Sequence, residues 1–305
     1  MEIKNILIVG GSGIIGSNLI LKLSRKNKIF VFDKKKLNTK KKNIFFIKGD
    51  CSKSFNYNKL PKKIDIVFYL VGIKGGKNSL NLNTLEKYIY NNFNILVKFL
   101  NILKKKKTKK IIFTSTEHVY GDNDKSNNKC MHLETFPKNY YGFSKLLAEK
   151  YLFNFYKNTS INVDILRIPR VIYPNDNSVI SVIIKKTYLN KKIILKKAKS
   201  NFNFIFIDDL IDAMMISSKQ INSKFRILNI FNNSKPVSLL QIVNKIKKIY
   251  GGNKKVLLDN SAAIDHNPIN LNISNKFAKK SLSWQPKFSF QKIINKLTNT
   301  YELRK

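Results

Sequence analysis

The sequence is poor in several residue types, and each shortage excludes a class of protein. Its only 2 cysteines, Cys51 and Cys130, are too few for a disulfide framework or a cysteine-rich metal site. No apolar run approaches the roughly 18 residues that a membrane-spanning helix needs. The chain opens directly into the apolar stretch Ile3–Val9, without the charged leader of a secretory signal. We therefore expect a cytoplasmic protein with no membrane partner and no metal site.

Acidic residues are also scarce, since 18 Asp+Glu stand against 58 Lys+Arg and leave a net charge of +40. Such a charge is typical of proteins that bind nucleic acid or an anionic membrane. However, 53 of the cationic residues are Lys and only 5 are Arg, while 39 Asn accompany only 6 Ala. Lys and Asn have AT-rich codons, so a biased genome explains this composition without a polyanion. We expect only non-specific nucleic-acid binding, and solvated turns at the lysine runs Lys34–Lys42 and Lys104–Lys110.

The apolar content is sufficient for a full core, because 43% of the residues are hydrophobic and 11% aromatic. In the first half of the chain, apolar runs of strand length alternate with helical segments. Strands are predicted at Ile3–Val9, Ile29–Phe32, Ile44–Ile47, Ile64–Val71, Ile111–Thr114 and Val163–Ile168, and helices at Ile14–Leu23, Leu82–Leu103 and Tyr140–Tyr156. This order predicts an α/β fold of the Rossmann type, a doubly wound parallel sheet with helices on both faces.

The second half is less regular and predicts a smaller, mixed α/β lobe. Helices are predicted at Val179–Leu189, Leu210–Ser217 and Leu239–Tyr250, the last capped by Gly251–Gly252, with a strand at Phe204–Ile207 and a closing segment at Phe288–Tyr301. We expect residues 1–168 to form the sheet domain and residues 169–305 the smaller lobe. Residues 204–217 are expected to return to the sheet domain.

A glycine-rich loop joins the first predicted strand to the first predicted helix. Gly10, Gly13 and Gly16 allow a tight turn, a close approach to a phosphate and close packing of the helix on the sheet. The start of the helix, at Ile14 and Ile15, offers backbone N–H groups to a pyrophosphate. This strand–loop–helix context predicts a dinucleotide-binding site.

Asp33 follows the second predicted strand, 17 residues after Gly16. A carboxylate there accepts hydrogen bonds from the ribose hydroxyls of NAD and repels the 2′-phosphate of NADP. The neighbouring Lys34–Lys36 could neutralise such a phosphate, which leaves NADP open. We favour NAD.

Tyr141 and Lys145 are one turn apart on the same face of a predicted helix. A nearby ammonium favours the phenolate, so the pKa of Tyr141 is expected to fall below its ordinary value of about 10. The tyrosine could then act as a general base. Thr114–Thr116 ends the fifth predicted strand, where the ligand crevice of such a sheet lies.

Taken in order along the chain, these motifs resemble the extended short-chain dehydrogenases/reductases, the family of nucleotide-sugar epimerases and dehydratases. The resemblance covers nearly the whole chain. It rests on Gly10–Gly16, Asp33, Gly49–Asp50, Leu70–Gly72, TSTEHVYG at Thr114–Gly121, Tyr141–Lys145, LRIPRVIYP at Leu166–Pro174, NFIFIDD at Asn203–Asp209 and LSWQPKF at Leu282–Phe288.

The resemblance implies a role for each matching residue. Thr116 would hold the reacting sugar hydroxyl, Tyr141 would be the catalytic base, and Lys145 would assist it and hold the nicotinamide ribose. Further cofactor contacts are implied at Asp50, Cys51, Leu70, Val71, Lys74, Asn92 and Pro169, and substrate contacts at Thr116, Glu117, His118 and Arg170.

Two departures from the family pattern bear on the substrate and the reaction. Phe202 stands where the family often has the arginine that grips the sugar-nucleotide diphosphate, so the anchor could be Arg170 or one of the lysines at 196, 197 and 199. The 4,6-dehydratases carry Asp and Glu after the threonine. Here Glu117 and His118 follow, and the glutamate is one position early.

The resemblance therefore implies an NAD-dependent epimerase that oxidises a nucleotide sugar at C4 and returns the hydride. A 4,6-dehydratase and a 4-keto-sugar reductase are the alternatives of the same class. A non-catalytic RNA-binding protein on the same fold is the alternative of another class. The family also implies a homodimer joined through the helices Leu82–Leu103 and Tyr140–Tyr156.

Overall fold

The computed structural model describes residues 3–37, 41–53, 57–121, 135–174, 178–196, 198, 201–232, 235–250, 256–259 and 271–302. Several features of the sequence lie outside these residues, namely Cys130, Lys197, Lys199, the predicted cap at Gly251–Gly252 and residues 38–40 of the first lysine run.

The centre of the molecule is a sheet of seven parallel strands in the order β11-β6-β5-β4-β1-β2-β3. Their bounds are β1 (Asn5–Val9), β2 (Lys28–Asp33), β3 (Ile44–Lys48), β4 (Lys63–Tyr69), β5 (Lys107–Thr116), β6 (Asn162–Ile168) and β11 (Phe225–Asn229). The strand order reverses between β1 and β4, and ligands of such sheets bind at the carboxyl ends of the strands beside this point. The predicted doubly wound sheet is confirmed.

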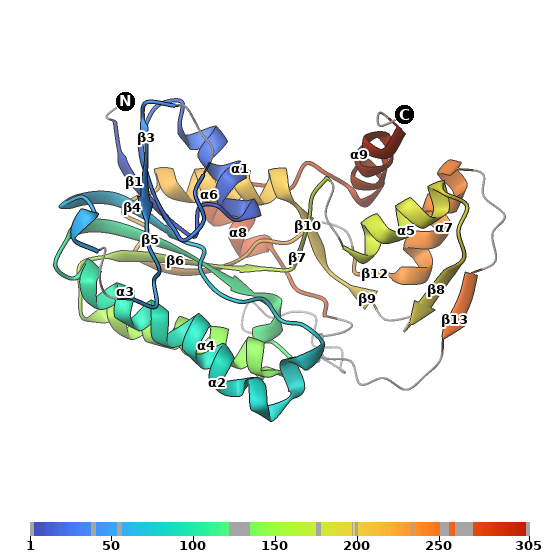
Figure 1. The fold of residues 1–305 in the computed structure, drawn as a ribbon, viewed down its shortest axis with the longest axis horizontal. Helices are drawn as coiled ribbons and strands as arrows, with labels where there is room; N and C mark the ends of the chain where they lie inside the picture. Colours follow the sequence, from blue (N-terminus) through green and yellow to red (C-terminus); the bar gives the residue numbers. More distant parts are fainter. Residues whose placement is uncertain are drawn as a thin grey trace.

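Helices cover both faces of the sheet, which explains why its strands are apolar without interruption (Figure 1). One face carries α1 (Ile14–Leu23), α6 (Ile207–Lys219) and α8 (Lys276–Leu282). The other carries α2 (Leu85–Ile89), α3 (Ile95–Leu103) and α4 (Tyr140–Lys157). Each face has its own cluster of buried apolar side chains.

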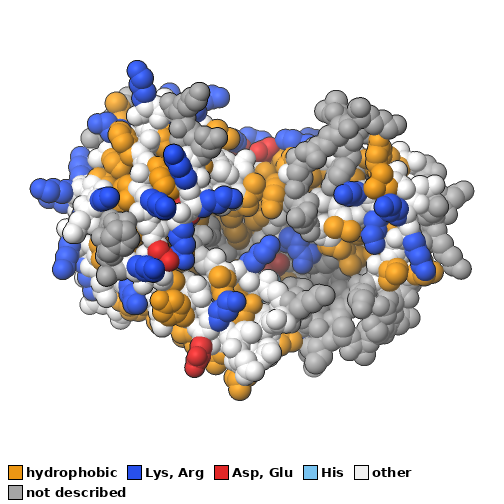
Figure 2. Space-filling view, in the orientation of Figure 1, with side chains coloured by type: hydrophobic (Ala, Val, Ile, Leu, Met, Phe, Trp, Pro, Cys, Tyr) orange, Lys and Arg blue, Asp and Glu red, His pale blue; other side chains and the backbone are white. Residues whose placement is uncertain are grey.

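A smaller lobe of mixed helices and short strands lies beside the sheet (Figure 1, right). It holds the helices α5 (Val179–Tyr188), α7 (Leu239–Tyr250) and α9 (Phe290–Glu302), with the strand pairs β8 (Ile193–Lys196) with β13 (Val256–Asp259) and β9 (Asn201–Phe202) with β12 (Val237–Ser238). A third pair, β7 (Arg170–Ile172) with β10 (Phe204–Phe206), lies between the lobes in this view. Figure 2 shows the surface hollowed between the lobes, with Lys and Arg scattered over this face. The division after residue 168 stays a prediction.

Three element predictions need correction. The segment Leu82–Leu103 is not one α-helix, because a π-helical turn at Tyr90–Asn94 separates α2 from α3. The strand predicted at Phe204–Ile207 ends at Phe206, since Ile207 already begins α6. The lysine run Lys104–Lys110 is not only a solvated turn, because β5 begins at Lys107 and Lys110 is fully buried.

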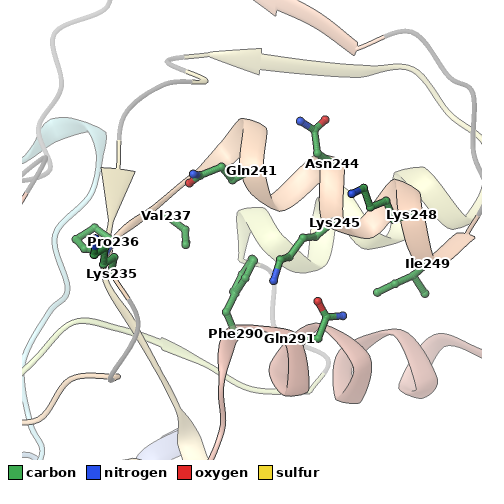
Figure 3. A pocket seen from close by; sticks show the side chains of 10 residues that line it. All are labelled: Lys235, Pro236, Val237, Gln241, Asn244, Lys245, Lys248, Ile249, Phe290 and Gln291. Carbon is green, nitrogen blue, oxygen red and sulfur yellow. The ribbon is translucent and has the colours of Figure 1, made fainter.

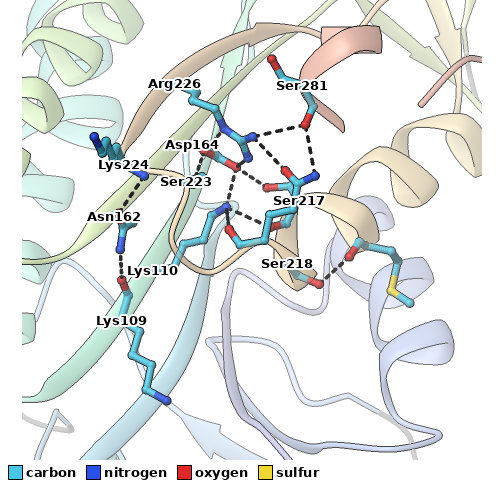
Figure 4. A network of polar contacts seen from close by, with 12 residues as sticks. Lys109, Lys110, Asn162, Asp164, Ser217, Ser218, Ser223, Lys224, Arg226 and Ser281 are labelled. Atoms are coloured by element: carbon cyan, nitrogen blue, oxygen red, sulfur yellow. Dashed lines mark hydrogen bonds and ion pairs between the residues drawn. The ribbon is translucent and has the colours of Figure 1, made fainter. Parts of the chain in front are cut away.

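Lys110 is buried because a carboxylate of the next strand neutralises it (Figure 4). Its Nζ lies 2.6 Å from Asp164 Oδ2 on β6 and donates to the carbonyls of Ser217 and Gln220 at the end of α6. Arg226 of β11 also pairs with Asp164, at 2.6 Å. This cluster therefore joins the sheet to α6 through fully used donors and acceptors.

Candidate active site

The glycine loop between β1 and α1 is shaped for a ligand that approaches the backbone. Gly10 has a φ of +83°, and a Cβ there would lie 3.1 Å from the chain at Leu70 and Val71. A Cβ on Gly16 would lie 2.5 Å from Gly11 Cα, so only glycine lets α1 pack this closely. Gly13 is exposed and caps α1 without a side-chain hydrogen bond. The first N–H groups of α1 are thus presented to an anion.

Asp33 is tied directly to this loop. Its Oδ2 accepts from the backbone N–H of Ser12 at 2.9 Å, and its Oδ1 accepts from the N–H of Lys35 at 3.0 Å. Each carboxylate oxygen has a further lone pair, so the side chain can still accept from two ribose hydroxyls. The open helix start and this fixed carboxylate fit a pyrophosphate and a ribose, both of which NAD contains.

Asp50 and Cys51 lie after β3, on the same edge of the sheet. Burial raises the pKa of Asp50, but hydrogen bonds from Lys34 and Ser52 outweigh it and hold the pKa at about 2. Burial raises the pKa of the Cys51 thiol to about 12, so this cysteine is no nucleophile. The predicted cofactor contacts at both residues stay predictions.

Asn92, in the π-helical turn, hydrogen-bonds the backbone of the segment after β4. The fully buried Asn92 accepts from the N–H of Ile73 at 2.7 Å and donates to its carbonyl at 3.1 Å. It also donates to Ser144 Oγ on α4 at 3.0 Å. Asn92 therefore positions the backbone beside the predicted cofactor contacts.

The remaining predicted cofactor contacts follow the strand ends. Leu70 extends β4 by one hydrogen bond, from its N–H to the carbonyl of Val9 at 2.9 Å. Val71 packs partly buried against the α3/α4 core, and Lys74 is exposed three residues further on. Pro169 is buried between β6 and β7. All four residues follow the carboxyl ends of β4 or β6, where the prediction needs them.

The structure brings Thr116 and Tyr141 together. Thr116 ends β5, Tyr141 lies in the first turn of α4, and their side chains are hydrogen-bonded. Tyr141 also packs edge-on against the His118 ring at 5.2 Å and near Tyr88 at 6.1 Å. A Cβ on Gly75 would lie 2.8 Å from the Tyr141 ring. Gly75 was not singled out in the sequence, although it directly follows the predicted cofactor contact Lys74.

The expected lowering of the Tyr141 pKa is wrong for the protein alone. Burial raises the pKa of Tyr141 to about 12, and the charge of Glu117 adds to the rise, while the Thr116 hydrogen bond opposes it. Lys145 does not compensate, because burial lowers its own pKa to about 7 against the attraction of Glu149. Its Nζ lies 4.1 Å from the centroid of the Phe113 ring. Spacing alone could not reveal that both groups are desolvated.

Glu117 is buried at the same site. Its Oε2 accepts from Asn203 Nδ2 at 3.1 Å, and Asn203 also donates to the carbonyl of Leu271 at 2.9 Å. Burial raises the pKa of Glu117 to about 8, although Asn203 and the charge of Arg170 oppose the rise. The carboxyl group is therefore a potential proton donor at neutral pH.

His118 is oriented by the residue that caps α4. Asn139 accepts from the N–H of Gly142 at 2.8 Å, so its amide nitrogen faces His118 Nδ1 at 2.9 Å. This network assigns Nδ1 as an acceptor, which is the neutral ring with its proton on Nε2. A Cβ on Gly142 would lie 2.3 Å from the His118 carbonyl, so the glycine allows α4 to begin here.

The structure describes two of the four candidate residues for the diphosphate anchor, Arg170 and Lys196. Arg170 begins β7 and is partly buried near Glu117, and Lys196 ends β8. Phe202 lies in β9, next to Asn203. Arg170 is thus the candidate anchor that the structure brings to the predicted site.

A separate groove of about 670 Å³ lies in the smaller lobe, between α7 and α9 (Figure 3). Its lining residues are Lys235, Pro236, Val237, Gln241, Asn244, Lys245, Lys248, Ile249, Phe290 and Gln291. None of them is a predicted site residue. The groove is therefore distinct from the candidate active site.

Comparisons with known proteins show the family of this chain. Residues 6–230 match the family described as the NAD dependent epimerase/dehydratase family, and the chain belongs to it. A dTDP-D-glucose 4,6-dehydratase of Dictyostelium discoideum is 32% identical over 81% of this chain, which spans 62% of that relative's length. A putative UDP-glucose 4-epimerase of Methanocaldococcus jannaschii is 26% identical over 96% of this chain and 97% of its own.

A solved structure of similar fold is the UDP-glucuronic acid 4-epimerase of Bacillus cereus with UDP-glucuronic acid and NAD. It is 24% identical, covers 99% of this chain and 100% of its own, and superposes with a TM-score of 0.84. At the level of the family, the expected enzyme class and the expected cofactor NAD are confirmed. Across the described residues, no helix has the length and apolar character that crossing a membrane requires.

Proposed function

We propose that the protein is an NAD-dependent nucleotide-sugar 4-epimerase. The observation that carries the proposal is the juxtaposition of Thr116 and Tyr141, with Lys145 one turn on, at the carboxyl end of β5. The relatives named above supply the substrate class. The glycine loop and Asp33 provide the matching cofactor site.

In this mechanism Thr116 positions the sugar C4 hydroxyl and Tyr141 removes its proton. NAD, when bound, supplies the acceptor and the returning donor of the hydride, together with a positive ring charge. The pKa of Lys145, about 7, is close enough to neutral pH for the lysine to accept or release a proton during the catalytic cycle. The 4-keto sugar must rotate within the hollow between the lobes, so that the hydride returns to the other face of C4.

The test is turnover of a panel of UDP-, dTDP-, GDP- and CDP-sugars with NAD, followed by NMR, for the wild type and for Tyr141→Phe. We expect a 4-epimer from at least one sugar. Tyr141→Phe should lower the rate by about 10²–10⁴, because it removes the general base. Full turnover by Tyr141→Phe would exclude the mechanism. Tight, salt-resistant RNA binding without sugar turnover would favour the non-catalytic alternative.

A second candidate function, 4,6-dehydration, is favoured by Glu117. Its buried carboxyl group keeps its proton up to about pH 8 beside Tyr141, as an acid for water elimination requires. The relative from Dictyostelium is named as a dehydratase. A 4-keto-6-deoxy product that disappears with Glu117→Gln, while C4 oxidation persists, would establish this reaction. A 4-epimer made at an unchanged rate by Glu117→Gln would refute it.

We also propose a cytoplasmic homodimer that pairs through α2, α3 and α4. Support comes from the large apolar side chains that α4 and the π-helical turn between α2 and α3 expose, since Phe143 is 41%, Phe153 45% and Tyr90 41% exposed. Light scattering at physiological salt should give twice the chain mass of 35.4 kDa. Phe143→Lys should then yield monomers, and a monomeric wild type would refute the dimer.

A further inference from the structure

A second layer of buried charge lies behind Lys145. Glu149 follows it by one turn of α4 and is 3% exposed. Arg167 of β6 grips this carboxylate at both oxygens, with Nε 3.1 Å from Oε1 and Nη2 2.6 Å from Oε2. The hydroxyl of Ser115 on β5 donates to Oε1. Two neighbouring strands therefore hold Glu149 from the sheet side.

Arg167 is itself fixed in orientation. Its guanidinium lies 4.7 Å from the centroid of the Tyr120 ring, and the Tyr120 hydroxyl donates to Asn229 Oδ1 at 2.7 Å. A planar fork that binds a carboxylate at two points and stacks on an aromatic ring is specific to arginine. Glu149 can turn toward Lys145 only by giving up these bonds.

Lys145 precedes Glu149 by one turn of α4. It is 5% exposed and faces the Phe113 ring, and its ammonium has no hydrogen-bond partner among the described residues. The elements around Lys145 carry further titratable and charged groups, which include Tyr141 and Glu149 on α4, Arg167 on β6, Tyr69 on β4, and Glu117, His118 and Tyr120 after β5.

We propose that Arg167 is a positioning residue that keeps Glu149 from pairing directly with Lys145, so that the lysine can exchange its proton during the reaction. This inference rests on the proposed function, because it deepens the role of Lys145. Arg167 neutralises Glu149, so a protonated Lys145 leaves these three buried groups with a net charge of +1. Without Arg167, the carboxylate is free to turn and to stabilise the lysine ammonium directly.

The test measures the protonation of Lys145 without turnover. The full-length protein is acetylated with trace acetic anhydride between pH 5 and 11, and mass spectrometry follows the Lys145 peptide. The wild type should titrate at about 7. Arg167→Gln should raise the midpoint by about one unit or more, whereas Glu149→Gln should lower it. A purely structural role would not move the two variants in opposite directions.

Further variants keep the outcome decisive. Arg167→Lys retains the charge without the fork and should shift the midpoint upward by less than Arg167→Gln. Ser115→Ala removes one hydrogen bond to Glu149, and it replaces Arg167→Gln as the test variant if Arg167→Gln does not fold. Arg226→Gln loosens a similarly held carboxylate elsewhere and should leave Lys145 unchanged. An unchanged Lys145 midpoint in Arg167→Gln overturns the inference, even if the enzyme epimerises sugars. If Arg167→Gln does not fold, an unchanged midpoint in both Ser115→Ala and Arg167→Lys overturns it.

Discussion

Two buried clusters of the molecule combine the same kinds of charged group and differ in their properties. Each contains one carboxylate, one lysine and one arginine, and each includes a residue of β6. The register pairs Ile112 with Asp164 and Ser115 with Arg167, and this odd offset along β6 places the clusters on opposite faces of the sheet. The two clusters are Lys110–Asp164–Arg226, on the α6 face, and Lys145–Glu149–Arg167, on the α4 face.

The two clusters differ in the hydrogen bonds and the pKa of their lysines. Lys110 donates to Asp164 and to two backbone carbonyls, which uses all three of its donors. Burial lowers the pKa of Lys110 only to about 8, because Asp164 opposes the fall, whereas the pKa of Lys145 falls to about 7. Lys110 therefore stays charged and structural at neutral pH. Lys145 makes no such hydrogen bonds to the described residues, so burial lowers its pKa further and leaves it available for proton transfer at neutral pH.

The largest expected effect separates the two lysines by activity. Lys145→Met should lower the rate by about 10²–10⁴ and leave the protein folded, because methionine fills the space without a buried charge. The measurement is kcat on the sugar that the NMR panel identifies, together with thermal unfolding. Turnover at the wild-type rate would place Lys145 among structural residues, like Lys110.

The next effect concerns stability alone. Asp164→Ala should destabilise the protein by about 3–5 kcal/mol, because it leaves Lys110 and Arg226 buried without their counter-ion. Urea unfolding gives the free energy, and activity per folded molecule should stay unchanged. If stability is kept, the Asp164 cluster is not the structural one, and the contrast between the clusters fails.

A pH dependence should distinguish Glu117 from both clusters. The unfolded chain releases the Glu117 proton near the ordinary pKa of 4.5, whereas the folded protein keeps it to about 8. The folded state thus binds more protons between these values, and stability falls with rising pH by at most about 1.4 kcal/mol per unit. In urea unfolding at several pH values, Glu117→Gln should flatten this fall. Parallel curves for the two proteins would contradict the raised pKa.

The smallest effect is expected at an exposed ion pair. Lys22 and Asp212 lie 2.8 Å apart, with side chains 43% and 28% exposed. Lys22→Ala should change the free energy of unfolding by less than about 1 kcal/mol, because water and salt screen the pair. A loss as large as that of Asp164→Ala would show that burial does not explain the stability of the Asp164 cluster.

Local patterns predicted much of the fold. The apolar run in β1 and the glycines at 10, 13 and 16 belong to one continuous stretch, so spacing alone indicated the strand, the turn and the helix start. The same holds for Tyr141 and Lys145, one turn apart. The π-helical turn at Tyr90–Asn94 was not predicted, and its residue Asn92 hydrogen-bonds Ile73 in another segment, a contact that local spacing does not reveal.

The sequence by itself therefore determined the parallel sheet, the nucleotide-binding loop and the identity of the candidate Thr–Tyr–Lys set, because these follow from periodicity and from residues close in the chain. Only the tertiary structure decided how those groups titrate. Glu117 meets Asn203 across 86 residues, and Arg167 reaches Glu149 from another strand. Proton affinity depends on burial and on charges brought together by folding, and no spacing along a chain encodes either.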